Sequence, residues 1–257
     1  MPKVDLNNAS STGRIVVGTA GWSIPRASAL HFAGDGTHLQ RYARILEGAE
    51  INSSFHRAHA QAVYERWAAS TPPEFRFAVK LPRAITHVQK LRRARPLLDR
   101  FLEESAGLGD KRGPILVQLP PSLPFDRRVA GRFFDLLRER YAGDVVCEPR
   151  HPDWFTASAE TLLWRFRVAR AAADPPPTPG ADRPGAFDGL VYFRLHGAPR
   201  KYWSPYTDDY IAVLASRIRT LPSSCDVWCM FDNTASGAAL ANAWQLHVTL
   251  QPYRPSE

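Results

Sequence analysis

Eight short apolar runs recur along the 257-residue chain, and each one ends abruptly in polar or charged residues. Continuous runs of this kind, rich in Val, Ile and Phe, are typical of parallel strands that are buried on both faces. Stretches with the helical spacing of apolar residues, such as Leu39–Leu46 and Ala62–Ala69, separate most of the runs. The runs are Ile15–Gly18, Ala49–Ile51, Phe75–Val79, Ile115–Val117, Val145–Cys147, Val168–Ala173, Leu190–Phe193 and Val227–Phe231.

Eight strands that alternate with helices predict an α/β fold, a single (β/α)8 TIM-like barrel over residues 14–257, rather than an open doubly wound sheet. No GxGxxG follows the first run, which argues against dinucleotide binding. We expect the sixth unit to be irregular, because residues 174–189 are too rich in Pro and Gly for a helix. Residues 1–13 are polar and predict a disordered lead-in rather than a signal peptide.

The chain is basic, with 33 Lys and Arg against 25 Asp and Glu and a net charge of +8. This balance favours anionic partners. The excess of basic residues is spread along the chain rather than gathered in one segment, so nucleic acid is only one open alternative among such partners. Three cysteines without a CxxC pair exclude a full disulfide framework and fit a reducing compartment. No apolar run is long enough for a transmembrane helix. We therefore expect a cytoplasmic protein without membrane contact, of undefined oligomeric state.

Polar residues that follow the runs form the candidate site, because active sites of such barrels lie at the C-terminal ends of the strands. Opposed charges gathered at one barrel end can bind an anionic, hydroxyl-rich ligand. Aromatic side chains among them could form the walls of the pocket. The candidate substrate-binding residues are Trp22, Glu50, Asn52, Arg57, Lys80, His87, Gln118, Arg150, Trp154, Arg194, Tyr202 and Asn233.

The candidate catalytic residues are Glu148, His151 and His196. Glu148 ends the fifth run, so its carboxylate should enter the pocket and require a cationic partner such as Arg150. A raised pKa would make it a general acid or base, and an internal ion pair is the equally open alternative. Alternation along the seventh run places Arg194 and His196 on the same face as Tyr192.

A metal site is not predicted. Glu50, His87, Glu148, His151, Asp174 and His196 carry suitable ligand atoms, but no diagnostic spacing such as HExxH occurs. Neighbouring Lys and Arg residues favour an anion over a cation. The sequence does not identify a cofactor, and both the GxSxG and the P-loop patterns are absent.

Seven motifs in order resemble the DUF72 family, also called YecE-like proteins. They are GTAGW (Gly18–Trp22), EINSSFHR (Glu50–Arg57), FRFAVKLPRAITH (Phe75–His87), GPILVQLPPS (Gly113–Ser122), EPRHPDW (Glu148–Trp154), YFRLHG (Tyr192–Gly197) and FDNTASGAALANA (Phe231–Ala243). The resemblance implies a TIM barrel of unassigned function and supports the candidate pocket. Asp232 stands where the family usually has Asn, and its added charge can offset one Arg.

The leading functional hypothesis is an enzyme, either a hydrolase or an isomerase, that acts on a small anionic, oxygen-rich substrate such as a sugar phosphate or nucleotide fragment. In it, Glu148 or His196 is the acid or base, and Lys80, Arg150 and Arg194 form an electrostatic clamp. One alternative is a nucleic-acid-binding or endonuclease IV-like processing protein, by fold analogy only, which requires a basic rim. The other is a non-catalytic ligand-binding barrel.

Overall fold

The computed structural model describes residues 13–251, so all but Gly13 of the predicted lead-in lies outside the described residues. The described strands are β1 (Ile15–Ala20), β2 (Gly48–Ile51), β3 (Arg76–Lys80), β4 (Arg112–Gln118), β5 (Val145–Glu148), β6 (Val168–Arg170), β7 (Ala172–Asp174), β8 (Gly185–Ala186), β9 (Leu190–Leu195) and β10 (Asp226–Phe231). The described α-helices are α1 (His38–Tyr42), α2 (Gln61–Ala69), α3 (Arg95–Ser105), α4 (Arg127–Arg138), α5 (Ala157–Arg165), α6 (Asp208–Arg219) and α7 (Ala238–Leu250).

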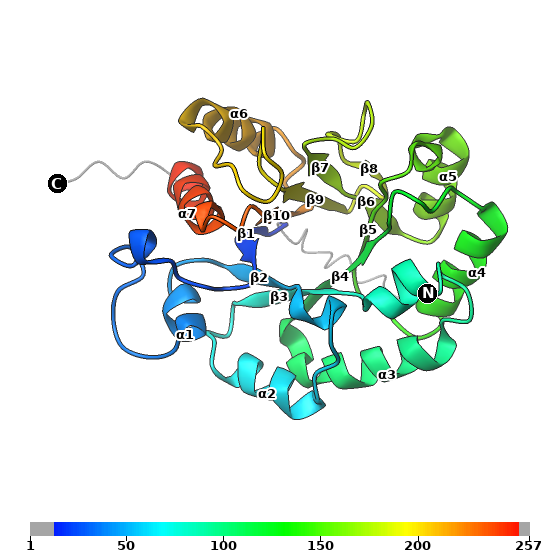
Figure 1. Ribbon diagram of the computed structural model, residues 1–257, viewed down its shortest axis with the longest axis horizontal. Helices are drawn as coiled ribbons and strands as arrows, with labels where there is room; N and C mark the ends of the chain where they lie inside the picture. Colours follow the sequence, from blue (N-terminus) through cyan, green and yellow to red (C-terminus); the bar gives the residue numbers. More distant parts are fainter. Residues whose placement is uncertain (1–12, 252–257) are drawn as a thin grey trace, which may run out of the picture.

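The strands form one sheet in the order β7-β9-β10-β1-β2-β3-β4-β5-β6-β8. β6 pairs with β5, and β7, which follows β6 after Ala171 alone, pairs with β9. Residues 168–174 therefore act as one interrupted strand that joins the two ends of the sheet. The eight resulting parallel strands, with helices around the outside (Figure 1), confirm the predicted (β/α)8 TIM-like barrel.

The sixth unit is irregular, as predicted. Between β7 and β9 the chain forms loops and the two-residue strand β8, which pairs antiparallel with β6, and no helix. Proline at 175–177, 179 and 184 removes backbone donors and fixes φ, so a helix cannot propagate through this segment.

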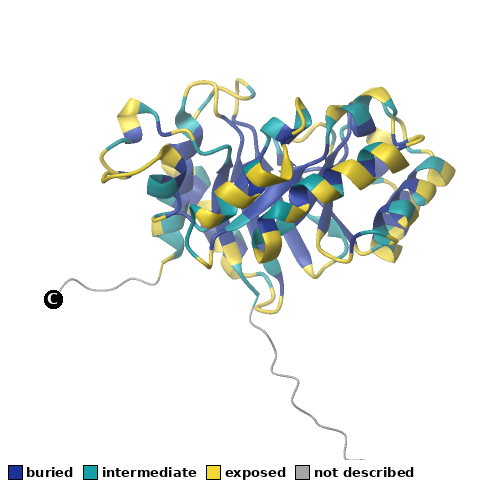
Figure 2. Ribbon diagram, turned by 90° about the horizontal axis from the view of Figure 1, so that it is seen from below, coloured by how far each residue is buried: buried dark blue, intermediate teal, exposed yellow. Residues whose placement is uncertain are grey.

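Alternation along the strands sorts the apolar side chains into two layers. Val16, Ala78 and Val146 belong to a small cluster inside the barrel, whereas Val17 and Val79 belong to a larger cluster between strands and helices. Figure 2 shows the consequence, with the strands buried and the exposed residues concentrated on the helices and loops. Successive side chains of a strand point to opposite faces, and here both faces are covered.

The inward-facing positions change from apolar to polar toward the C-terminal end of the barrel, which we call the mouth. At the ends of five strands a polar residue lies two positions after a buried apolar one. Lys80 follows Ala78, Gln118 follows Leu116, Glu148 follows Val146, Arg194 follows Tyr192, and Asp232 follows Met230. The same period of two that builds the apolar interior thus delivers charged side chains to the mouth.

A capping side chain marks the start of four of the described α-helices, namely α1, α4, α5 and α6. α4 starts at Arg127, earlier than the predicted stretch around Phe133–Tyr141, because the Asp126 carboxylate accepts hydrogen bonds from the backbone N–H groups of Arg128 and Val129 at 2.9 and 3.1 Å. Its inner face buries Phe133 with neighbouring apolar residues. None of the described helices combines the length and apolarity needed to cross a membrane.

We predict that Gly18→Ala destabilises the barrel. A Cβ at Gly18 would lie 2.0 Å from the carbonyl oxygen of Gly48 on the paired strand, so β1 and β2 would have to move apart. Forced overpacking of this kind costs about 1–3 kcal/mol. The free energy of unfolding in urea measures the loss.

Gly131→Ala in α4 is the matched control, since its nearest new neighbour, a methyl of Leu162, would be 3.7 Å away. Alanine there should leave the protein as stable or up to about 1 kcal/mol more stable. Equal unfolding free energies for the two variants would contradict the tight β1–β2 approach.

Candidate functional site

Arg194 is fully buried at the centre of the mouth, and three carboxylates surround its guanidinium group. Glu50 forms a bidentate ion pair with it, in which Nη2 and Nε of Arg194 donate to the carboxylate at 2.7 and 3.0 Å. Glu148 lies 3.0 Å from Nη1, and Asp232 lies 3.1 Å from Nη2. The Tyr192 hydroxyl donates to Glu50 at 3.0 Å. Planar forked donors match carboxylates in this way, so Arg194 organises the ends of four strands.

His196 lies between two of these carboxylates. Its Nδ1 is 3.0 Å from Oδ2 of Asp232, and its Nε2 is 3.0 Å from Oε1 of Glu148. An ionised carboxylate can only accept, so either both ring nitrogens carry hydrogen or one carboxyl group does. The three groups therefore form a buried chain along which a proton can be held or moved.

Glu148 is held in its ionised form. Burial raises its pKa, but the charges of Arg194, Arg150 and His196 outweigh burial and keep the pKa well below its usual range. The pKa of Asp232 is lowered as well, since Arg194 and His196 overcome the effect of its burial. The raised pKa that would make Glu148 a general acid is not found. Its geometry fits the alternative, an internal ion pair.

Lys80 differs from the other buried charged groups of the mouth. It is 6% exposed, yet among the described residues it belongs to no ion pair and its ammonium group makes no hydrogen bond. Its Nζ lies 4.1 Å from the ring centroid of Phe55. Burial and the charge of Arg194 lower the pKa of Lys80 to about 8, although the three carboxylates around Arg194 oppose this shift.

His87 and Gln118 complete this side of the mouth. Burial and the nearby charges of Lys80, Arg83 and Arg150 lower the pKa of His87 to about 4, so its imidazole is neutral at physiological pH. Its Nδ1 lies 2.8 Å from the Thr86 hydroxyl. Gln118 is buried and pairs in register with Glu148 on the neighbouring strand.

The loop after β9 covers the network from the solvent side. The chain turns at Gly197, where φ is +87°. The loop then brings Tyr202 beside His196, with 5.3 Å between the centroids of the two rings. Arg150 donates to Tyr202 Oη at 3.0 Å and to Glu148 at 3.2 and 3.3 Å. Arg150 and Tyr202 are thus the outermost members of the network.

Two asparagine acceptors lack a partner. Asn52 follows β2 and Asn233 follows β10, and the buried Oδ1 of each has no hydrogen-bond partner among the described residues. The Asn233 amide nitrogen donates to Ser204 O and Asn242 Oδ1, which fixes the orientation of the amide. Unpaired buried acceptors are uncommon and mark places where a hydroxyl group can donate.

The two candidate tryptophans lie outside the charged network. Trp22 packs edge-on against Trp67 and Phe77 in the layer between strands and helices. Trp154 is buried in the same layer, where its indole N–H donates to Leu123 O at 3.0 Å. The expectation that they wall the pocket is therefore wrong, because both rings pack on the outer face of the barrel.

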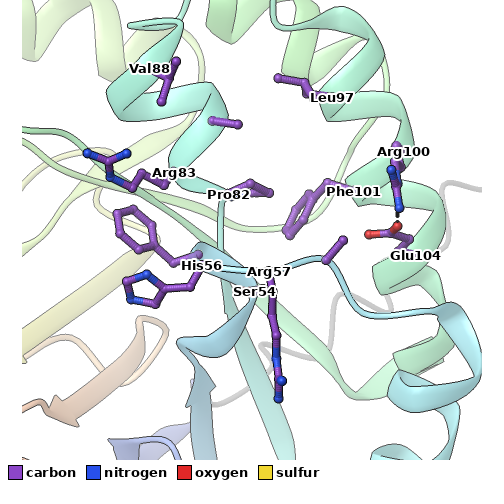
Figure 3. A pocket seen from close by; sticks show the side chains of 13 residues that line it. Ser54, His56, Arg57, Pro82, Arg83, Val88, Leu97, Arg100, Phe101 and Glu104 are labelled. Carbon is purple, nitrogen blue, oxygen red and sulfur yellow. Dashed lines mark hydrogen bonds and ion pairs between the residues drawn. The ribbon is translucent and has the colours of Figure 1, made fainter.

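Two further candidates are engaged locally. The His151 ring accepts a hydrogen bond from the backbone of Asp153 and so caps a short helical turn, rather than joining His196. Arg57 is exposed and lines a groove of about 350 Å³ beside the mouth, formed by residues 54–58, 82–88 and 97–104. Figure 3 shows this groove, with the Arg100–Glu104 ion pair at one side and the Arg57 side chain directed away from it.

Three residues that take part in the site are not among the predicted catalytic and substrate-binding residues. Tyr192 and Asp232 belong to the Arg194 network, and Phe55 holds the Lys80 ammonium group. Alternation from Arg194 already identifies Tyr192 as inward-facing. Asp232 stands where the family usually has Asn, which predicts a negative charge that offsets an Arg, and Asp232 does contact Arg194. Nothing in the sequence indicates the contact between Phe55 and Lys80.

Among residues 13–251, no three His, Cys, Asp or Glu side chains are arranged so that they could hold a metal ion. The carboxylates of the mouth are instead directed at Arg194 and His196. A buried network of carboxylates, Arg and His at the mouth of eight parallel strands defines a (β/α)8 barrel with one polar centre.

The chain belongs to the DUF72 family. A family model described as "Protein of unknown function DUF72" matches residues 16–256, which confirms the resemblance. UPF0759 protein YecE of Escherichia coli (strain K12) is 31% identical over 147 residues, and the match covers 57% of this chain and about half, 52%, of that relative.

Solved structures of the family share the fold. A DUF72 family protein from Thermotoga maritima MSB8 superposes with a TM-score of 0.77 at 23% identity, covering 92% of this chain and 98% of that one. One from Enterococcus faecalis V583 gives a TM-score of 0.76 at 20% identity, covering 95% and 99%.

We predict that Arg194→Met lowers the free energy of unfolding at pH 7 by about 3–5 kcal/mol, since three buried carboxylates lose their counter-charge. The pKa values of Glu148 and Asp232 are lower in the folded wild type than in the unfolded chain. This difference stabilises the folded protein at pH values above the unfolded-state pKa values, and the stabilisation is lost as the pH falls through the folded-state pKa values. In the variant these pKa values rise, so its deficit should shrink as the pH falls toward about 4.5.

Urea unfolding at several pH values measures this difference. Arg66→Met is the control, because Arg66 is exposed on α2 and forms no ion pair with a described residue. A deficit for Arg194→Met no larger than that of Arg66→Met, or one independent of pH, would contradict the central role of Arg194.

Proposed function

We propose that the mouth binds a small anionic, oxygen-rich substrate and performs acid–base chemistry on it. The observation that carries this proposal is the Lys80 ammonium group, which is nearly buried at the mouth and unpaired among the described residues although three carboxylates lie nearby. A cation left without a partner in such a place provides a site for an anionic group.

Each charged side chain has a different part in this proposal. Arg194 is enclosed by Glu50, Glu148 and Asp232, so it positions the network rather than contacting a ligand. Arg150 reaches the rim, and its Nη1 has no hydrogen-bond partner among the described residues, which leaves that nitrogen for the anion. The clamp then consists of Lys80 and Arg150.

His196 is the proton carrier of the proposal. Its two carboxylate partners contact both ring nitrogens and fix the position and orientation of the ring, which is what a general acid or base requires. The Tyr202 ring and Arg150 cover it, so movement of this rim would admit the substrate. The unpaired acceptors of Asn52 and Asn233 suit hydroxyl groups of an oxygen-rich molecule. Hydrolysis and isomerisation are both compatible with these groups.

A nucleic acid is the second candidate ligand, favoured by a groove between α3 and α4. Arg92, Arg93, Arg95 and Arg132 line this groove of about 470 Å³. Phosphate contacts of this kind produce binding that weakens steeply with salt. Salt-dependent binding of a short oligonucleotide, lost in Arg93→Ala and retained in Lys80→Met, would favour this candidate over the first.

We predict that Lys80→Met weakens binding of small anions to the mouth by tenfold or more, a loss of about 1.4 kcal/mol. Inorganic phosphate, glycerol 3-phosphate and a panel of sugar phosphates serve as probes, and the thermal shift gives affinity from its concentration dependence. The variant should fold, since removing an unpaired buried charge also removes its desolvation cost.

Lys90→Met is the matched control, because Lys90 is exposed in the loop after β3. It should respond to the probes as the wild type does. If no probe stabilises the wild type, or if both lysine variants lose the response equally, the mouth is not the anion site.

A further inference from the structure

Lys80 has the surroundings of a nucleophile as well as those of an anion-binding group. A carboxylate partner would hold the proton on the ammonium group, and none is in contact with it among the described residues. The chain has five lysines, at 3, 80, 90, 111 and 201, and uses arginine at every other Lys/Arg position. Arginine could supply charge at position 80, but only lysine supplies an amine that can lose its proton.

We propose that Lys80 forms an imine with an anionic carbonyl compound bound at the barrel mouth. The site then takes a 2-oxo acid or a phosphorylated aldehyde or ketone, whose anionic group contacts Arg150. The inference rests on the proposed function, because it requires that the mouth bind an anion, and it adds the carbonyl group as the reacting part of the substrate.

The reaction consumes only the amine and the carbonyl compound. The neutral Lys80 amine adds to the carbonyl carbon and gives a carbinolamine. That intermediate accepts one proton on its oxygen and loses water, which leaves a protonated imine. In total, one ammonium group and one carbonyl group give one protonated imine and one water, without an oxidant or reductant.

Several neighbours fit the proton transfers. His87 is close enough to Lys80 and Arg150 for both charges to depress its pKa, and its neutral ring can take a proton from the attacking nitrogen. The chain from Glu148 through His196 to Asp232 can hold the proton that the departing oxygen needs. Tyr202 covers this chain and would exclude bulk water from the imine.

The charges that face Lys80 come from several strands. Arg194 on β9 opposes the protonated amine, whereas Glu50 on β2, Glu148 on β5 and Asp232 after β10 favour it. Burial decides the balance and brings the pKa of Lys80 to about 8. At about pH 7.5 its neutral fraction therefore exceeds that of an unperturbed lysine by roughly a hundredfold.

Trapping by borohydride tests the inference. The full chain is incubated with pyruvate or glyceraldehyde 3-phosphate, reduced with sodium borohydride, and mapped by peptide mass spectrometry. We expect the secondary-amine adduct on Lys80 in at least about tenfold excess over the exposed Lys90, because the pKa of Lys80 is lowered to about 8 and Lys90 lies outside the mouth. Lys80→Arg, which keeps the charge and lacks the amine, should carry no adduct at position 80 and no increase elsewhere.

Hydroxyacetone, a neutral carbonyl compound, controls for the anionic group and should label Lys80 far less. Equal labelling by hydroxyacetone, or adducts spread equally over the lysines, would overturn the inference. If phosphate stabilises the wild type through Lys80 but no probe is trapped, imine formation is excluded and anion binding stands. If neither phosphate nor a carbonyl probe acts at Lys80, both proposals fail together.

Discussion

The buried guanidinium group of Arg194 is the interaction on which the mouth of this barrel depends. It joins carboxylates from β2, from β5 and from the end of β10, so one side chain ties together strands that are distant in sequence. Burying four charged groups is costly, and the cost is offset only because each of them has a charged or hydrogen-bonding partner. The network therefore fixes the positions of Glu148, Asp232 and His196 through directional contacts with one another and with Arg194.

The charged groups of the mouth fall into two sets, those that are paired with one another and those that have no partner among the described residues. Arg194 is enclosed by its three carboxylates and offers no free positive charge to a ligand. Groups with unsatisfied capacity at its edge include Lys80 and one nitrogen of Arg150. In the proposed function the internal ion pairs position the scaffold and the unpaired edge groups contact the ligand, which is the arrangement that a preorganised site requires.

Much of this could be predicted from the sequence, because the signals are local. The apolar runs predicted the strand positions, although the run Val168–Ala173 did not indicate the interruption at Ala171, and alternation placed Arg194 and His196 inside the barrel with Tyr192. What alternation cannot supply is the loop geometry beyond each strand end. Trp22, Trp154 and His151 follow strands closely, yet turns direct them into the outer layer or into a local cap. The lowered pKa of Glu148 also depends on distances between strands, which no local pattern encodes.

The network leaves Lys80 as a nearly buried amine that has no ion-pair partner among the described residues. The most direct measurement is an NMR titration of the Lys80 side chain in protein labelled with 13C and 15N lysine, with assignment from the Lys80→Arg variant. Five lysines make the spectrum simple. We predict a pKa of about 8 for Lys80, below the value of about 10.4 that a lysine has in a model peptide. A Lys80 pKa at or above about 10.4 would mean that a carboxylate pairs with the ammonium group, and it would contradict both the anion site and the imine.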